Sequence, residues 1–287
     1  MNKRRITYTI ILLIVIIVII TASALLLPQE RGASPGNTLT TSNSEGPPAS
    51  ATTASISLSG VPHRALIYDS LAREYPDPQE VSMLKKILEG IGFNVTVYYG
   101  ANATLDPLVG MGQYGLVIIR AHGAYNGDPN SGKPLGAYVY TGMYVIEAEA
   151  VYGVKNIEDG IRKGYYAPAV IPRPGVPLEE LPKYLSVSPK FFRDLAGEMN
   201  KTIVFFTGCY GFQDDRLAKA IIGKGASVYI AWDGNVTWLH ADEFLLEWVR
   251  DLARTGDPLR ALEMANETIG PDPYTGAVVR IMVRSNG

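Results

Sequence analysis

The sequence predicts an α/β fold built on a mostly parallel sheet of about six strands, and three observations support this prediction. Short apolar runs alternate with segments of helical periodicity from about residue 61 onward. The apolar runs are continuous rather than alternating, which is typical of strands covered on both faces. Apolar residues make up 47% of the chain and charged residues 19%, so the chain can fill the core that such a sheet needs.

The elements follow one another in a regular order after residue 61. RALIY at 64–68 predicts the first strand, and the segment after it carries an apolar stripe at intervals of three and four, at Val81, Leu84, Leu88 and Ile91. Further strands are expected at 93–99, 115–120, 202–207 and 226–232, and a sixth on an edge at 277–283. Helices are expected at 215–223, 241–254 and 258–269.

Residues 124–200 interrupt this alternation. The segment is rich in Tyr, Gly and Pro, and GAYVYTGMYVIEAEAVYGV at 136–154 favours a hairpin. A long segment of this kind between two core strands commonly borders a functional site. We therefore expect an insertion that forms a rim or lid.

The N-terminal part of the chain has a different composition. A basic flank at residues 1–5 precedes 22 uncharged residues at 6–27, which are enough to cross a bilayer of roughly 30 Å. The flank predicts a cytoplasmic N-terminus, and hence a single-pass protein of the cell membrane whose domain at 61–287 lies outside. A cleaved signal peptide is the alternative, because Ala22-Ser23-Ala24 resembles a cleavage site. Residues 28–60, rich in Ser, Thr, Pro and Gly, predict a disordered stalk.

Asn-x-Thr sequons support an exterior, glycosylated protein, since five occur where chance would give fewer than one. They lie at Asn94, Asn102, Asn200, Asn235 and Asn266. The chain has a single cysteine, Cys209, so an internal disulfide is excluded.

Three polar residues fall at predicted strand ends: Asp69, His122 and Cys209. Ligands of parallel α/β sheets bind outside the carboxyl ends of the strands. A cysteine before a helix N-terminus can gain thiolate character, and a histidine on a neighbouring strand end can take its proton. Lone buried cysteines are more often small apolar residues, so Cys209 alone leaves both interpretations open.

The two strand ends, LVIIRAHG at 116–123 and IVFFTGCYG at 203–211, are similar to those of the caspase–gingipain–separase clan of cysteine peptidases, which includes gingipain-like and CHAT-type members. That clan has one apolar strand ending in His-Gly and a later one ending in a small residue and Cys. The likeness continues through RLAKAIIGKGASVYIAWDGNV and ADEFLLEWVRDLARTGDPLRALEMANET, and covers roughly residues 64–268. Two departures are the long spacing between His122 and Cys209 and Thr207 where some members carry Asp.

The resemblance implies a caspase-like three-layer fold and a Cys-His dyad. Cys209 would be the nucleophile and His122 the general base and acid. The backbone N–H groups of Gly123 and Cys209 would form the oxyanion hole.

The resemblance also implies a substrate pocket near the end of the first strand and the loop after the fifth, where Asp69, Trp232 and Asp233 lie. A carboxylate there would select Arg or Lys in a peptide. Arg73 would instead neutralise Asp69 or select an acidic residue. Both aspartates are equally compatible with ordinary turns.

Other function classes lack their motifs. The three histidines and one cysteine match no metal-ligand spacing, and no glycine-rich phosphate loop follows a predicted strand, so no metal or cofactor is expected. The formal net charge is -2, which does not favour nucleic acid as a partner.

We expect a membrane-anchored, extracytoplasmic cysteine endopeptidase acting on peptides or proteins, with a preference for basic residues. A catalytically inactive surface binding or scaffold protein on the same fold is the main alternative. No G-x-S-x-G elbow occurs in the predicted domain at 61–287, which disfavours an α/β hydrolase.

Overall fold

The computed structural model describes residues 57–127 and 132–285. The predicted membrane-spanning segment at 6–27 and most of the predicted stalk lie outside these residues. Within the two described ranges, no helix is long and apolar enough to cross a membrane.

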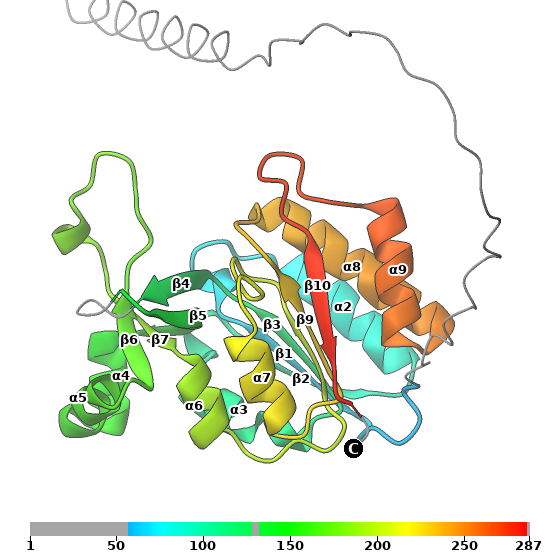
Figure 1. The fold of residues 1–287 in the computed structure, drawn as a ribbon, viewed down its shortest axis with the longest axis horizontal. Coiled ribbons are helices and arrows are strands. Elements are labelled where there is room, and N and C mark those ends of the chain that lie inside the picture. Colours follow the sequence, from blue (N-terminus) through cyan, green and yellow to red (C-terminus); the bar gives the residue numbers. More distant parts are fainter. Residues whose placement is uncertain (1–56, 128–131, 286–287) are drawn as a thin grey trace, which may run out of the picture. The chain divides into compact units, whose positions relative to one another are not determined.

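A six-stranded sheet forms the centre of the described domain (Figure 1). Its strand order is β10-β9-β8-β3-β1-β2, and all neighbours are parallel except β10 and β9. The strands are β1 (Arg64–Asp69), β2 (Asn94–Tyr99), β3 (Leu116–Arg120), β8 (Ile203–Phe206), β9 (Val228–Trp232) and β10 (Val279–Val283). The predicted α/β fold with a mostly parallel sheet of six strands is confirmed, and the predicted edge strand, β10, runs antiparallel to β9.

The continuous apolar runs are explained by burial on both faces of this sheet. Every residue of β3, β8 and β9 is buried. Successive residues alternate between two hydrophobic clusters, so that Ile203 and Phe205 face one side and Val204 and Phe206 the other. This alternation is the normal consequence of the strand pleat.

Helices cover both faces of the sheet. One face packs against α2 (Pro78–Gly90), α8 (Trp238–Thr255) and α9 (Pro258–Thr268), and the other lies against α3 (Leu105–Val109), α6 (Pro189–Asp194) and α7 (Arg216–Gly223). Short 3-10 helices lie between these elements: η1 (Leu71–Arg73), η2 (Gly100–Asn102), η3 (Gly110–Gln113) and η4 (Leu178–Glu180). The N-terminus of α2 is stabilised by Asp77, whose side chain accepts hydrogen bonds from the backbone N–H groups of Gln79 and Glu80.

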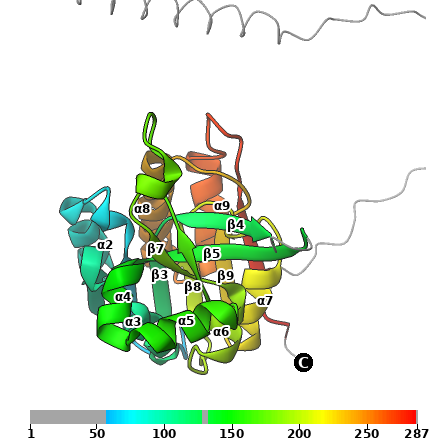
Figure 2. The same cartoon turned by 90° about the vertical axis from the view of Figure 1, so that its left-hand side faces the viewer.

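A second, smaller sheet is formed by the segment between β3 and β8. Its four antiparallel strands have the order β4-β5-β7-β6, with β4 (Gly123–Gly127), β5 (Pro134–Tyr144), β6 (Tyr166–Ala169) and β7 (Tyr184–Val187). Two helices, α4 (Val145–Tyr152) and α5 (Val154–Arg162), connect β5 to β6. Figure 2 faces this part of the molecule, with α4, α5 and α6 along its lower side.

The hairpin expected at 136–154 is not formed. Residues up to Tyr144 belong to one long strand, β5, and Val145–Tyr152 is the helix α4. The sequence VIEAEAVY contains Ala and Glu, which are strong helix formers. The Glu147 carboxylate accepts a hydrogen bond from the Tyr144 N–H at 2.8 Å and so caps the helix, and the hairpin partner of β5 is β4 instead.

The register of β3 and β8 determines where the predicted dyad lies. Ile119 of β3 is paired with Phe206 of β8 in a parallel ladder. His122 and Cys209 each follow three residues after this pair. Two residues at equal distances beyond a paired position emerge side by side at the carboxyl edge of a parallel sheet. The register therefore brings together residues that are far apart in sequence.

Candidate active site

The backbone segments that carry His122 and Cys209 touch each other at two glycines. A Cβ atom on Gly123 would lie 2.0 Å from the carbonyl oxygen of Cys209, and one on Gly208 would lie 2.4 Å from that of Ala121. Neither position has room for a side chain. The glycines are thus required for the close approach of the two strand ends.

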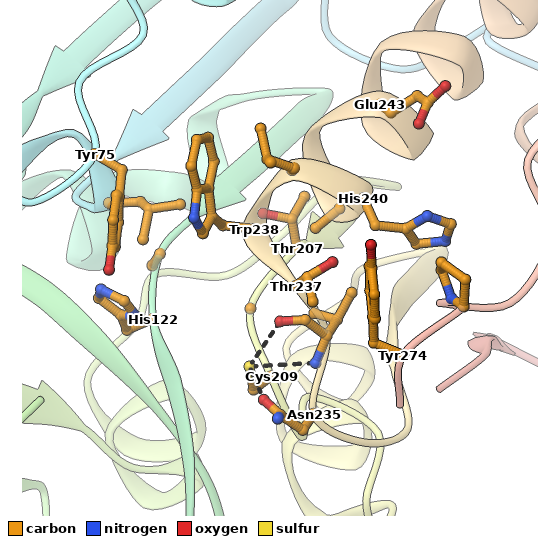
Figure 3. A pocket seen from close by; sticks show the side chains of 17 residues that line it. Tyr75, His122, Thr207, Cys209, Asn235, Thr237, Trp238, His240, Glu243 and Tyr274 are labelled. Atoms are coloured by element: carbon orange, nitrogen blue, oxygen red, sulfur yellow. Dashed lines mark hydrogen bonds between the residues drawn. The ribbon is translucent and has the colours of Figure 1, made fainter. Parts of the chain in front are cut away.

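A cavity of about 650 Å³ opens at this edge, and both His122 and Cys209 line it (Figure 3). Leu71 and Tyr75, which follow β1, contribute one wall. The loop after β9 and the first turn of α8, residues 235–241, contribute another, and Tyr274 lies beside Thr237 and His240. The cavity is a concave site of the size that binds small molecules and peptide side chains.

The Cys209 thiol is held by the loop after β9. Its Sγ lies 3.1 Å from the Oδ1 of Asn235, which accepts the thiol hydrogen, and the backbone N–H of Val236 approaches the sulfur at 3.5 Å. Burial raises the pKa of Cys209, and the N–H groups of Val236 and of Cys209 itself oppose this rise. The group is therefore a neutral thiol at neutral pH.

The His122 imidazole has no hydrogen-bond partner among the described residues, and its Nε2 is buried. Its ring lies between those of Tyr75 and Tyr140, with centroids 6.0 Å and 5.9 Å away. Burial lowers the pKa of His122 to about 4, against an opposing effect of the Glu74 charge. The imidazole is neutral at neutral pH, which is the form that a general base requires.

Two backbone N–H groups beside the thiol are open. Within the described ranges, no backbone carbonyl accepts a hydrogen bond from the Cys209 N–H, which interacts with the sulfur of its own side chain. The Tyr140 N–H donates to the His122 carbonyl at 3.0 Å, which makes Gly123 and Val139 a non-hydrogen-bonded pair of the β4–β5 ladder. The Gly123 N–H therefore points away from β5.

Asp69 does not line the cavity, contrary to the expectation for a substrate pocket. It is fully buried, and its carboxylate lies 2.9 Å from the guanidinium of Arg120. The two residues are direct neighbours in the β1–β3 register. Arg73 does not pair with Asp69 either, because both of its terminal nitrogens bind the Glu147 carboxylate, at 2.7 and 2.8 Å.

Trp232 and Asp233 also lie away from the cavity. Trp232 is fully buried, with its ring 5.2 Å from that of Phe244 in the core. The Asp233 carboxylate accepts hydrogen bonds from the Val278 N–H at 2.9 Å and from the Arg280 side chain at 3.0 Å. These contacts hold β10 against β9, so neither residue is available to a substrate bound beside Cys209.

Arg120 is the centre of a buried cluster of charges below the site. Besides Asp69 it binds Asp242 of α8 through two hydrogen bonds of 2.8 and 2.7 Å. Glu80 lies 3.4 Å from the guanidinium, and its carboxylate accepts no hydrogen bond from any described residue. Burial and the neighbouring Asp242 raise the pKa of Glu80. One cation cannot balance three buried carboxylates, so Glu80 retains its proton at neutral pH.

The residue that organises the cavity rim is Asp272, which the sequence analysis did not identify. Its carboxylate accepts hydrogen bonds from the N–H and hydroxyl of Thr237 and from the N–H groups of Tyr274 and Thr275, all between 2.7 and 3.0 Å. Burial would raise the pKa of Asp272, but these donors lower it to about 2. The signal in the sequence is PDPYTG, since Asp before Pro and Gly is typical of a side-chain-capped turn.

A second cavity, of about 810 Å³, lies on the other side of Asn235. It is lined by Gly123, Tyr140 and Tyr210 among others, and Asn235 lines both cavities. Gly123 and Tyr210, the residues that follow His122 and Cys209 in sequence, thus border a second hollow.

No group of three or more His, Cys, Asp or Glu residues within the described ranges is placed to hold a metal ion. Comparison with known proteins adds no assignment, because no protein-family model matches the chain and a search of curated proteins finds no match.

Proposed function

We propose that the protein is a cysteine endopeptidase on a caspase-like fold, with Cys209 as nucleophile and His122 as general base and acid. One observation carries the proposal. Paired strands bring a thiol and an unpartnered neutral imidazole to the same cavity, three residues beyond Ile119 and Phe206. Structural histidines in folded proteins are normally hydrogen-bonded, so the free ring nitrogen favours a functional role.

The reaction follows from the atoms present. His122 takes the thiol proton as Sγ attacks the peptide carbonyl carbon, and the oxyanion is held by the N–H groups of Gly123 and Cys209. His122 then gives that proton to the amine as the C–N bond breaks, leaving a thioester. Water attacks the thioester, His122 accepts its proton, and the acid leaves as the proton returns to Sγ.

Fold and location are part of the same proposal. Two features support the caspase-like assignment: helices cover both faces of the sheet, and the strands that precede His122 and Cys209 are neighbours. Its other support is the resemblance of LVIIRAHG and IVFFTGCYG to strand ends of that clan. The asparagines of all five sequons are exposed, which favours an exterior, membrane-anchored protein acting on peptides or proteins. The proposed preference for basic residues loses its support, because Asp69 and Asp233 are engaged elsewhere.

A non-catalytic binding or scaffold protein on the same fold is the second candidate. It is favoured by the hydrogen bond between the thiol and Asn235, which leaves Cys209 and His122 without a bond to each other. Catalysis requires the thiol hydrogen to turn from Asn235 to the imidazole when substrate enters.

An activity-based acyl probe on the full chain distinguishes the candidates. We expect labelling of the wild type and none of Cys209→Ala. His122→Ala keeps the only thiol, so a fall of its labelling by about 100-fold or more would assign the proton transfer to the imidazole. His63→Ala, which changes an exposed histidine outside the cavity, serves as the matched control and should label like wild type. Equal labelling of wild type and His122→Ala, or no labelling at all, would overturn the peptidase proposal.

A further inference from the structure

The cavity beside Cys209 is bordered by exposed apolar side chains. The exposed fractions are 38% for Tyr75, 38% for Trp238, 64% for Leu239 and 85% for Tyr274. All four line the same cavity. Exposed apolar residues gathered around one hollow indicate a binding site, since a folded protein gains nothing by leaving them in water.

One aromatic wall is held in place before any ligand arrives. Tyr75 and Trp238 are stacked, with ring centroids 5.1 Å apart and planes 18° from parallel. Asp272 accepts hydrogen bonds from the backbone of Thr237, which precedes Trp238, and from the backbone of Tyr274. Figure 3 shows Tyr75 and Trp238 on one side of Cys209 and Tyr274 on the other. Rigid aromatic side chains bind apolar groups at a low cost in conformational entropy.

The charges of the cavity disfavour ionic side chains. No Lys or Arg occurs among the described residues that line it, so an acidic side chain would find no cationic partner. Its one carboxylate is that of Glu243, which Figure 3 shows on α8 pointing away from Cys209. The aspartates expected to bind a basic side chain are paired with Arg120 and Arg280.

We propose that this cavity receives a large apolar side chain, aromatic by preference, from the substrate residue that supplies the scissile carbonyl. The inference rests on the proposed peptidase function. The substrates are then polypeptides cut after Phe, Tyr, Trp, Leu or Met, instead of after Arg or Lys. Tyr75, Trp238 and Tyr274 are the specificity-determining residues.

A peptide series tests the proposal on the full-length protein. The peptides differ only at the scissile residue, which is Phe, Leu, Ala, Arg or Asp, and kcat/KM is measured for each. We expect the Phe peptide to exceed the Arg and Asp peptides by about 10-fold or more. Tyr274→Ala should lower kcat/KM for Phe several-fold more than for Ala. Leu178→Ala removes a similarly exposed apolar side chain outside the cavity and should change neither.

A preference for Arg that disappears in Glu243→Gln would overturn the inference and assign the specificity to Glu243. Equal kcat/KM values across the series would also overturn it.

A binding measurement separates this failure from failure of the proposed function. Cys209→Ala is titrated with the same peptides by calorimetry, and the Phe peptide should bind at least several-fold more tightly than the Arg peptide. Tighter binding of Phe without cleavage by the wild type would refute the peptidase function and keep the apolar preference. Cleavage without a preference refutes the preference alone, and the absence of both binding and cleavage refutes the two together.

Discussion

The end of β3 passes through two contrasting environments within three residues. Arg120 is fully buried and bonded on every side, by Asp69, Asp242 and the carbonyl oxygen of Tyr75. His122, two residues later, is partly exposed, and its imidazole forms no hydrogen bond with any described residue. The charge of Arg120 is thus paired with carboxylates of the protein itself, whereas a ring nitrogen of His122 has no hydrogen-bond partner among the described residues and lies beside a cavity.

This difference separates structural from functional polar groups. A buried charge must be paired, because desolvation of an unpaired ion costs several kcal/mol. A neutral imidazole without a partner costs less and is available to another molecule. The two environments are also connected, since Arg120 donates to the carbonyl of Tyr75, a wall of the cavity. The buried cluster therefore supports the site without taking part in its chemistry.

Removal of the central cation should give the largest effect on stability. Arg120→Met leaves the buried carboxylates of Asp69 and Asp242 without a counterion and should lower the free energy of unfolding by about 3–5 kcal/mol. Denaturant unfolding followed by circular dichroism measures this loss. Arg260→Ala removes one side of an exposed pair with Glu263 and should cause no measurable change. A loss in Arg120→Met as small as in the control would show that the cluster does not stabilise the fold.

The stability of the wild type should fall by about 1.6 kcal/mol as the pH rises from 6.5 to 8. The pKa of Glu80 is raised to about 8, chiefly by burial, so the folded state holds a proton that the unfolded state has already lost above its ordinary carboxyl pKa. The stabilisation is thus complete below the ordinary pKa and is lost as the pH passes through the raised one. Denaturant unfolding at several pH values measures this slope, and Glu80→Gln should flatten it. An unchanged slope in the variant would assign the effect to another group.

His122→Ala should change the free energy of unfolding at pH 7 by less than about 1 kcal/mol, because no hydrogen bond is lost. Below the ordinary pKa of histidine the two proteins should diverge. The pKa of His122 is lowered to about 4 by burial, so the unfolded chain binds its proton first and the wild type loses stability as the pH falls toward 4. The variant should not show this part of the profile. A loss of several kcal/mol at pH 7 would instead make His122 a structural residue like Arg120.

The smallest effect should be on the reactivity of the thiol. Asn235 accepts the hydrogen of the neutral thiol, and loss of this acceptor should favour the thiolate. Asn235→Ala should therefore react with iodoacetamide about 3-fold faster at pH 7, which mass spectrometry reads directly since Cys209 is the only cysteine. Asn266→Ala, an exposed sequon asparagine on α9, is the control. Slower alkylation in Asn235→Ala would mean that the amide activates the thiol.

The strands of the core could be predicted from the sequence because their signal is local. The runs expected at 64–68, 115–120 and 226–232 differ from β1, β3 and β9 by at most two residues at either end. Burial on both faces requires apolar side chains at every position, and that requirement is visible in each run by itself. The hairpin expected at 136–154 failed for a related reason. The helix propensity of VIEAEAVY is also a local property. It ended the strand at Tyr144, although the Tyr- and Val-rich pattern before it had suggested that a second strand of a hairpin would follow.

The candidate site was predictable only in part. The positions of His122 and Cys209 at strand ends follow from where two apolar runs stop. The roles assigned to Asp69 and Asp233 depended on what else approaches them, and Arg120 and Arg280 are 51 and 47 residues away in sequence. The aromatic wall was missed because Tyr75, Trp238 and Tyr274 come from three separate segments.

Amino-acid order alone thus determined the alternation of strands and helices and the two strand ends that carry the thiol and the imidazole. Periodicity and propensity act over a few residues, so they can be read without knowing the fold. Tertiary structure decided which carboxylates are neutralised, which glycines are in backbone contact and which aromatic rings meet around Cys209. Those properties depend on distances between segments that only the folded structure brings together, and charge pairing and packing fall off within a few ångströms of contact.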